Sequence, residues 1–189
     1  MSVSPSPARL SVCVYCGSRF GTNPAYKAAA TELGQTLADQ GWRLVYGAGD
    51  VGLMGAVASG AQAEGGETFG VIPEHLLRRE VGKRDLSQFI VTENMHERKK
   101  VMYMNSDAIV VLPGGAGSLD ELFEVLTWRQ LGLHEKPIYL LNVDGYWQPL
   151  LALLDHVIEQ GFADASLRDY FAVADTVPAL RDALRNALS

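Results

Sequence analysis

The chain has 189 residues, of which 48% are hydrophobic and 20% are charged, a composition that suits one domain with a substantial core. Sixteen basic against 22 acidic residues leave a net charge of -6, which gives no general attraction to nucleic acid polymers. No apolar run is long enough to cross a bilayer, and the first residues lack the pattern of a secretory signal. We therefore expect a flexible tail at 1–8, one domain at 9–189, a cytoplasmic location and no membrane partner.

The two cysteines, Cys13 and Cys16, form a C-x-x-C pair, a spacing that redox motifs share. A reactive pair needs its first cysteine at a helix N-terminus, where the thiolate is stabilised. Cys13 lies instead within the apolar run 10–15, which is typical of a buried strand, and two thiols alone make an incomplete zinc site. We predict buried thiols, with no metal bound here or elsewhere.

In chain order, short apolar runs alternate with longer segments of helical period. Strands are predicted at 10–15, 43–46, 68–72, 89–91, 108–112, 137–141 and 171–173. Helices are predicted at 24–40, 53–64, 95–106, 118–131, 148–160 and 178–188. This alternation predicts an α/β fold: a Rossmann-like, doubly wound parallel sheet of about seven strands with helices on both faces. The stretch 73–88 is expected to be a binding loop or to carry a short helix of its own.

Three predicted strands end in loops that contain glycine: 16–19, 47–55 and 113–121. The carboxyl ends of parallel strands meet at one edge of a sheet, where ligands bind in such folds, so the loops should converge. The second loop fits G-x-G-x-x-G, which can present backbone N–H groups to an anion at a helix start. The same letters can also serve a tight turn with close helix–strand packing, and the sequence leaves both interpretations open.

The third loop carries glycines directly before a predicted helix. Gly114, Gly115 and Gly117 leave backbone amides uncovered, and Ser118 can cap the helix and add a hydroxyl. Glu121 completes a capping-box pattern, in which its carboxylate would only accept a hydrogen bond from the Ser118 backbone. Phosphate would repel a carboxylate placed beside it, and a purely structural residue would not need that cost. We therefore favour a functional role for Glu121.

A basic segment opens the helix predicted at 95–106, which feeds the central strand. Arg98 can bind phosphate or carboxylate with two parallel hydrogen bonds, and Lys99 adds charge. The alternative is a solvated helix face. Connectivity places the start of this helix near the edge with the glycine loops, which favours a role in binding.

These motifs, taken in order, resemble those of the LOG (Lonely Guy) family of cytokinin-activating phosphoribohydrolases, many of which carry the label lysine decarboxylase. The family pattern P-G-G-x-G-[TS]-x-x-E is matched at 113–121. A G-G-G-x-x-G-L-M-G-like loop is matched at 47–55, and M-H-x-R-K is matched at 95–99. The similarity extends over about 12–162, which is nearly the whole chain.

The resemblance implies a homodimer with no cofactor that cleaves a nucleoside 5′-monophosphate, AMP or N6-isopentenyl-AMP, into free base and ribose 5-phosphate. Arg98 and Glu121 match the family's catalytic pair. Together with the loops, the resemblance gives an expected substrate-binding set of Gly17, Ser18, Gly49, Glu80, Met95, Lys99, Gly114, Gly115, Ala116, Gly117, Ser118, Leu119, Asp120 and Thr127.

The chemistry of N-glycoside cleavage suits these residue types. Positive charge develops on the sugar while negative charge develops on the departing base. Glu121 is expected to stabilise the sugar cation and to orient or deprotonate the attacking water. Arg98 would either anchor the phosphate or polarise the departing base, and the sequence does not choose between these roles.

The sequence departs from the family pattern at four positions. Ala48 replaces a glycine, where its methyl group is expected to meet the ligand, and Asp50 replaces a common serine. Ser118 replaces threonine and keeps the hydroxyl. Ala116 stands where an aromatic residue often occurs, which should widen the pocket.

Three other functions compete with phosphoribohydrolase activity. A non-catalytic nucleotide carrier would keep the glycine loops without depending on Glu121. A pyridoxal-dependent decarboxylase needs a Schiff-base lysine in a suitable setting, which the lysines here do not offer. An NAD-dependent oxidoreductase would use Glu74 for a ribose contact, but the carboxylate loop after the central strand would crowd that ligand.

Apolar residues surround much of the helix predicted at 118–131. Leu122, Phe123, Leu126 and Trp128 point in several directions around its axis. This pattern fits burial against a second subunit, and it also fits a large core within one chain.

Overall fold

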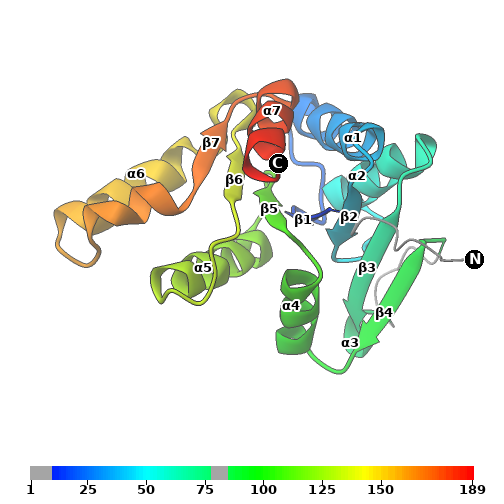
Figure 1. Ribbon diagram of the computed structural model, residues 1–189, viewed down its shortest axis with the longest axis horizontal. Coiled ribbons are helices and arrows are strands. Elements are labelled where there is room, and N and C mark those ends of the chain that lie inside the picture. Colours follow the sequence, from blue (N-terminus) through cyan, green and yellow to red (C-terminus); the bar gives the residue numbers. More distant parts are fainter. Residues whose placement is uncertain (1–9, 78–84) are drawn as a thin grey trace, which may run out of the picture.

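Figure 1 shows the protein as a computed structural model that describes residues 10–77 and 85–189. The predicted flexible tail at 1–8 lies outside the described residues, and so does Glu80. None of the helices in the described ranges is both long enough and apolar enough to cross a membrane.

One parallel sheet forms the centre of the molecule, with the strand order β4-β3-β2-β1-β5-β6-β7. Its strands are β1 (Ser11–Tyr15), β2 (Arg43–Tyr46), β3 (Thr68–Pro73), β4 (Gln88–Thr92), β5 (Ala108–Val111), β6 (Ile138–Leu141) and β7 (Ala172–Ala174). The chain adds strands on one side of β1 up to β4 and then returns to place β5 on the other side. This reversal between β1 and β5 leaves a crevice at the carboxyl ends of the two strands.

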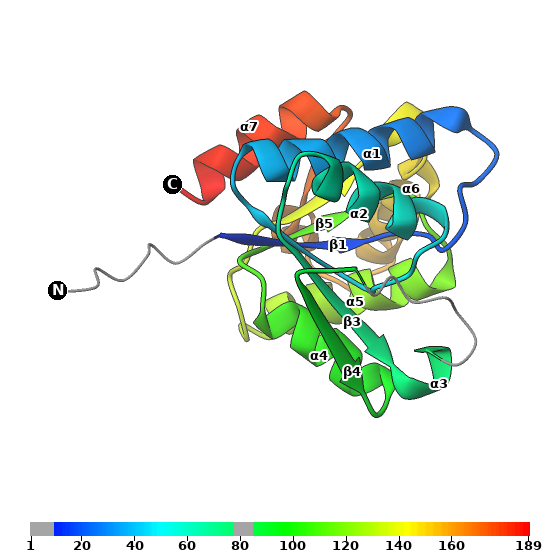
Figure 2. The same cartoon turned by 90° about the vertical axis from the view of Figure 1, so that its right-hand side faces the viewer.

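Helices cover both faces of the sheet, as Figures 1 and 2 show. One face carries α1 (Pro24–Asp39), α2 (Gly52–Ala63) and α7 (Val177–Ala187), and the other carries α4 (Met95–Met104), α5 (Ala116–Gln130) and α6 (Gln148–Glu159). Shorter elements complete the chain: α3 (Glu74–Leu77), η1 (Val143–Gly145) and η2 (Ala165–Tyr170). The fold is therefore an α/β sandwich of the Rossmann-like type.

Burial on both faces explains why β5 is an uninterrupted apolar run. Its residues alternate between two separate cores, Val110 packing beneath α1, α2 and α7 while Ile109 and Val111 pack beneath α4, α5 and α6. All three side chains are fully buried. A strand buried in this way is not expected at the edge of the sheet, and β5 indeed lies between β1 and β6.

The predicted strands and long helices are confirmed, with ends that differ by one or two residues. The expectation of a short helix within 73–88 is also confirmed, because α3 follows β3 directly. The start of α5 was predicted two residues too late. Gly115 adopts an extended conformation (φ -97°, ψ -153°) and is itself the N-cap, so the helix begins at Ala116.

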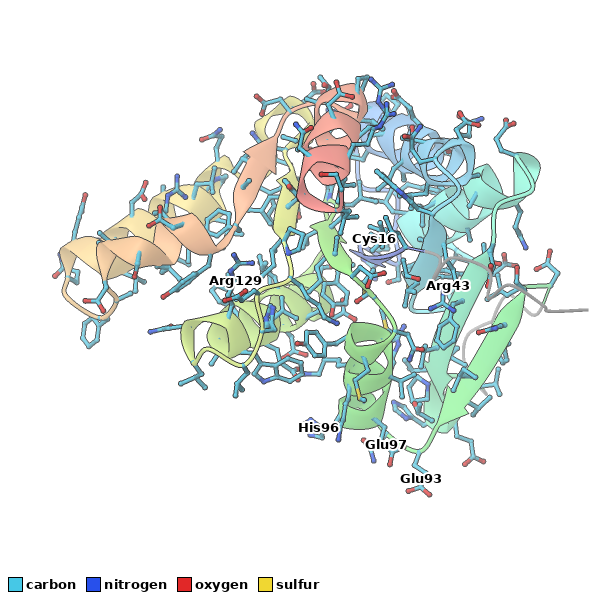
Figure 3. The ribbon with its side chains drawn as sticks, viewed as in Figure 1. Cys16, Arg43, Glu93, His96, Glu97 and Arg129 are labelled. Carbon is cyan, nitrogen blue, oxygen red and sulfur yellow. The ribbon has the colours of Figure 1, made fainter. Side chains whose placement is uncertain are left out.

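The two cysteines are buried free thiols, as predicted. Cys13 belongs to the core beneath α4, α5 and α6, whereas Cys16 belongs to the core beneath α1, α2 and α7, near the centre of Figure 3. Residues three apart along a strand point to opposite faces of the sheet. Burial raises the pKa of both thiols well above the ordinary value, which opposes thiolate chemistry at this C-x-x-C pair.

Candidate active site

A cleft of about 510 Å³ opens at the carboxyl edge of the sheet, where the strand order reverses. Its walls come from the segments that follow β1, β2 and β5, from the start of α4 and from the turn after β6. Of the expected site residues, it brings together Gly17, Ser18, Met95, Arg98, Gly114, Gly115, Ala116, Gly117, Ser118 and Glu121.

Backbone hydrogen bonds hold the three glycine loops together. The Gly17 amide donates to the Pro113 carbonyl at 3.0 Å, and the Leu53 amide donates to the Gly17 carbonyl at the same distance. A side chain on Gly17 would start 3.3 Å from the Cα of Gly114, which is tighter than ordinary packing. The convergence expected from the sequence is therefore present, with the loop after β1 between the other two.

The start of α5 presents uncovered backbone to the cleft. A Cβ added at Gly115 or Gly117 would meet nothing within 4 Å. The first amides of a helix have no partner within the helix, and the helix dipole favours negative charge there. This helix start therefore combines open space with the electrostatic features that favour an anion.

Ser118 does not cap α5, in contrast to the prediction. It lies in the first turn of the helix, and its buried side chain fills the space where Gly114 lacks a Cβ, since a Cβ there would lie 2.1 Å from the Ser118 Oγ. The capping box is excluded as well, because the N-cap is Gly115 and Glu121 lies in the second turn. Glu121 therefore needs another explanation.

Glu121 lies three residues after Ser118, on the same side of α5, and lines the cleft. Among the described residues it forms no hydrogen bond or ion pair within normal distance. Burial raises the pKa of Glu121 to about 7, although the nearby Arg98 charge partly offsets that effect. A carboxyl poised near neutral pH in a cleft is a common feature of catalytic acids and bases.

Arg98 of α4 is a buried cation that two backbone carbonyl groups hold, one in β3 and one in the loop after β2. Its Nη2 donates to the Gly47 carbonyl at 2.7 Å, and its Nε donates to the Val71 carbonyl at 3.1 Å. The remaining Nη1 faces the Met95 sulfur at 3.8 Å. The guanidinium is therefore fixed before any ligand arrives, and it needs no reorganisation to meet one.

The glycines of the loop after β2 serve packing within the protein. A Cβ on Gly47 would lie 2.0 Å from the Arg98 Nη2, and one on Gly55 would lie 2.4 Å from the Asp50 carbonyl oxygen. Gly49 does not line the cleft, because the Met54 side chain occupies the space beside it. Of the two interpretations left open, close helix–strand packing describes this loop.

Ala48 adopts a left-handed backbone conformation (φ 57°), which an alanine rarely takes and which accounts for glycine in the family pattern. The expectation that its methyl group meets the ligand is wrong. The side chain is completely buried, with its Cβ 2.8 Å from where a Cβ on Gly70 of β3 would lie. The departure from the pattern therefore changes the core beside β3.

Several expected site residues lie outside the cleft. The buried Lys99 ammonium pairs with Asp120 at 2.9 Å and with Glu124, tying α4 to α5. Burial lowers the pKa of Lys99, but these two carboxylates raise it more, and the net shift is upward. Leu119 and the exposed Thr127 also face away, the Thr127 hydroxyl donating to the Phe123 carbonyl at 2.7 Å.

Some residues of the cleft were missed by the sequence argument. The walls also contain Arg19, Phe20, Tyr26, Met54, Met102 and Tyr146. Tyr146 follows β6, so the rule that ligands bind after strand ends would have found it. No sequence motif marks Met54 or Met102, whose position depends on packing. In the described residues, no three His, Cys, Asp or Glu side chains gather as metal ligands.

The fold and the cleft define a Rossmann-like α/β protein with a cleft and an open helix start at its switch point. In this class of protein, nucleotides bind at such a helix start. The family model described as "Possible lysine decarboxylase" matches residues 54–184. The probable cytokinin riboside 5′-monophosphate phosphoribohydrolase LOG4 of Oryza sativa subsp. japonica is 46% identical over 176 residues, 93% of this chain and 76% of the relative. LOG5 of Arabidopsis thaliana, a cytokinin riboside 5′-monophosphate phosphoribohydrolase, is 45% identical over 86% of this chain and 72% of its own length. The chain belongs to this LOG family.

Solved structures confirm the fold. The molybdenum cofactor carrier protein of Chlamydomonas reinhardtii superposes with a TM-score of 0.73 at 24% identity, covering 95% of this chain and 98% of that one. The molybdenum cofactor binding protein of Rippkaea orientalis gives a TM-score of 0.75 at 23% identity, covering 97% and 100%. At such identities the likeness concerns the arrangement of strands and helices.

Proposed function

We propose that this protein hydrolyses the N-glycosidic bond of an adenosine 5′-monophosphate, AMP or its N6-isopentenyl derivative, releasing the base and ribose 5-phosphate. Membership of the LOG family supports this reaction. The observation that carries it is the pairing of an open helix start with Glu121 one turn further along the same helix. That spacing suits a ligand with a phosphate at one end and a sugar beside it.

The phosphate binds at Gly115–Gly117 in this proposal. Those residues leave room for an anion against the first amides of α5, and the helix dipole stabilises it. Binding energy gained at this remote group helps to position the glycosidic bond. A nucleoside without the phosphate should therefore be a poor substrate.

Glu121 acts on the sugar. In its carboxylate form it stabilises the positive charge that develops at the anomeric carbon, and it orients or deprotonates the attacking water. Its pKa, raised to about 7 by burial, leaves both protonation states accessible near neutral pH. The water adds to the anomeric carbon and gives one proton to Glu121 as the bond to the base nitrogen breaks. The departing base nitrogen takes one proton from solvent, and Glu121 returns its proton to solvent, so that the carboxylate is restored.

Arg98 carries the second charge of the site. Its guanidinium lowers the pKa of Glu121 and offers Nη1 to the substrate, while carbonyl oxygens fix the other nitrogens. Arg98→Ala should reduce both binding and turnover. A loss confined to AMP would assign Arg98 to the phosphate, whereas an equal loss toward adenosine would assign it to the base.

Chromatography of the bases released from a panel of nucleoside 5′-monophosphates tests the function. The purified protein should release adenine or the N6-modified base, and Glu121→Gln should lower turnover about 1,000-fold while the protein remains folded. Full activity in Glu121→Gln would contradict the mechanism. The carrier function is not favoured by the relatives, and binding of AMP without any release of base would restore it.

We further propose that the protein is a homodimer that buries the α4–α5 face. This face includes an apolar groove of about 410 Å³ lined by Tyr103, Met104, Trp128 and Leu133, beside His96 at the outer start of α4 in Figure 3. The Met104 and Leu133 side chains are each 65% exposed in the single chain. By contrast, Leu122 and Leu126 of α5 are buried in the chain's own core, so only part of the apolar α5 surface is available to a partner.

Light scattering coupled to size-exclusion chromatography tests the dimer. Wild-type protein should have twice the mass of the chain, and Leu133→Asp should give monomers, because a charge at the centre of an apolar interface is costly. Phe162→Asp is the matched control: Phe162 is 86% exposed and lies after α6. A monomeric wild type would refute the dimer.

The free thiols are in keeping with the cytoplasm, which we propose as the location.

A further inference from the structure

Tyr146 lines the cleft and belongs to none of the three glycine loops. Its hydroxyl donates to the carbonyl oxygen of Gly114 at 2.5 Å, across 32 residues of sequence. This hydrogen bond joins the turn after β6 to the loop after β5. The expected site residues do not include Tyr146, so its role in the cleft remains to be explained.

The turn that carries Tyr146 is held firmly. Asp144 and Gly145 both have positive φ angles, 49° and 74°, which turn the chain sharply after η1 begins. The Asn23 side chain at the start of α1 donates to the Asp144 carboxylate at 2.7 Å. The Tyr146 ring packs edge-on against Tyr26, with centroids 5.4 Å apart. These contacts hold the turn and the Tyr146 ring in place, and so they fix the position of the hydroxyl beside Gly114.

Fixing the Gly114 carbonyl also fixes the next amide. In a trans peptide the carbonyl oxygen and the following N–H point in opposite directions, and the described chain contains no cis peptide bond. The Tyr146 hydroxyl thus sets the direction of the Gly115 N–H, which belongs to the N-cap of α5. Gly114 needs this restraint, because a glycine rotates more freely than any other residue.

Two further contacts complete the restraint. The Gly17 amide donates to the carbonyl of Pro113, the residue before Gly114. The Ser118 side chain packs against the Gly114 Cα, in the space that a Cβ would occupy. The peptide that leads into the open helix start is thus held on three sides, and Tyr146 provides the hydrogen bond to its oxygen.

We propose that Tyr146 is a positioning residue for the anion site: its hydroxyl preorganises the Gly114–Gly115 peptide so that the start of α5 receives the 5′-phosphate. This inference rests on the proposed placement of the phosphate. It predicts an effect on ligands that carry the phosphate and none on ligands that lack it.

Tyr146→Phe tests the inference, because it keeps the ring and removes only the hydroxyl. Calorimetric titration with ribose 5-phosphate should show binding about tenfold weaker, the effect of one hydrogen bond of ordinary strength. Values of kcat/KM for AMP should fall by a similar factor, while the low values for adenosine stay within about twofold of wild type. Tyr139→Phe is the matched control, since the Tyr139 hydroxyl donates to the Ala183 carbonyl at 3.1 Å, between β6 and α7.

The outcomes separate clearly. Equal affinity of wild type and Tyr146→Phe for ribose 5-phosphate would overturn the inference, as would an equal loss toward AMP and adenosine. A comparable loss in Tyr139→Phe would also overturn it, because the effect would then be one of general stability. If wild-type protein releases no base, the proposed reaction fails, yet the titration still decides the role of Tyr146. Failure of wild type to bind ribose 5-phosphate would overturn the inference, whereas the proposed reaction is decided by the release of base.

Discussion

The glycine loops after β2 and β5 look alike in sequence but differ in what their glycines face. In the loop after β2, the space beside Gly47, Gly52 and Gly55 is occupied by other parts of the protein. In the loop after β5, the space beside Gly115 and Gly117 is open. At these three glycines of the first loop, other protein atoms fill the space where a side chain would lie, although Gly47 still lines the cleft. At Gly115 and Gly117 of the second loop, that space is empty.

Glycine thus serves two different purposes in the same cleft: close packing in the loop after β2 and an open backbone in the loop after β5. The closed loop lets Arg98 reach the Gly47 carbonyl, because no Cβ stands between them. The open loop leaves amides free for an anion at the start of the helix that bears Glu121. One loop therefore holds a charged side chain in place, while the other leaves the space that we propose the ligand occupies.

The largest expected effect concerns the closed loop. Gly52→Ala should lower the free energy of unfolding by about 3 kcal/mol or more, because its Cβ would lie 2.2 Å from the Ser18 carbonyl carbon at a residue with φ 64°. Gly41→Ala is the control, since Gly41 has φ 70° with nothing within 4 Å, and it should cost only about 1 kcal/mol. Denaturant titration measures both. Equal losses would mean that the closed loop is not tightly packed.

The second effect is a pH dependence of stability at Glu121. Between its ordinary pKa of 4.5 and its raised pKa of about 7, the unfolded carboxyl is ionised while the folded one keeps its proton. This group therefore lowers stability as pH rises through that window, and the penalty is constant above it. Glu121→Gln lacks the titration, so its stability relative to wild type should rise by on the order of 2 kcal/mol from pH 4.5 to 8.

Unfolding curves of both proteins at several pH values measure this difference. A difference that stays flat with pH would mean that the Glu121 pKa is ordinary. The kcat/KM for AMP should also fall below about pH 7 as the carboxylate is protonated. Since the substrate phosphate titrates near pH 6, the unfolding curves, which contain no substrate, are the cleaner measurement.

A third effect concerns the open loop. Gly115→Ala and Gly117→Ala should leave the free energy of unfolding within about 0.5 kcal/mol of wild type, because the added methyl groups meet no protein atom. Each should weaken ribose 5-phosphate binding about tenfold, since the methyl occupies space meant for the ligand. Unchanged ribose 5-phosphate binding in both variants would contradict the proposed difference between the two loops. A large loss of stability would show that protein atoms fill the space beside these glycines, as they do in the loop after β2.

The smallest effect is expected at Ala48. Ala48→Gly relieves a left-handed alanine, worth about 1 kcal/mol, but it removes a buried methyl group of similar value and makes the unfolded chain more flexible. Stability should change by less than about 1 kcal/mol. The kcat/KM for AMP should stay within about twofold, because the methyl points into β3. A marked change in the KM for AMP would show that Ala48 affects ligand binding after all.

Periodicity and strand-end logic were sufficient to predict the order of elements and the edge where the loops converge. The apolar runs could be recognised as strands because strands such as β5 are buried on both faces and therefore contain almost only apolar residues. The same patterns could not reveal which glycines face protein and which face a void. That distinction depends on side chains from distant segments, such as Arg98 meeting Gly47 across 51 residues.

The capping-box pattern shows a different limit. The spacing of Ser118 and Glu121 fits the pattern, yet the extended conformation of Gly115 starts the helix earlier. Helix starts depend on backbone angles that a glycine leaves undetermined, so the sequence alone does not fix them. The ion pairs of Lys99 were also invisible, because they form only when α4 and α5 pack together.

The separation of Cys13 and Cys16 onto opposite faces makes the two sulfurs independent reporters. A thiol reagent reaches Cys13 only when the layer of α4, α5 and α6 lifts from the sheet, so its labelling rate follows that opening. Cys16 is 8% exposed and lines the cleft, so a bound ligand should slow its labelling selectively. In single-cysteine variants, the labelling rate of Cys13 would thus measure how often that helix layer opens, and the labelling rate of Cys16 would measure whether the cleft is occupied.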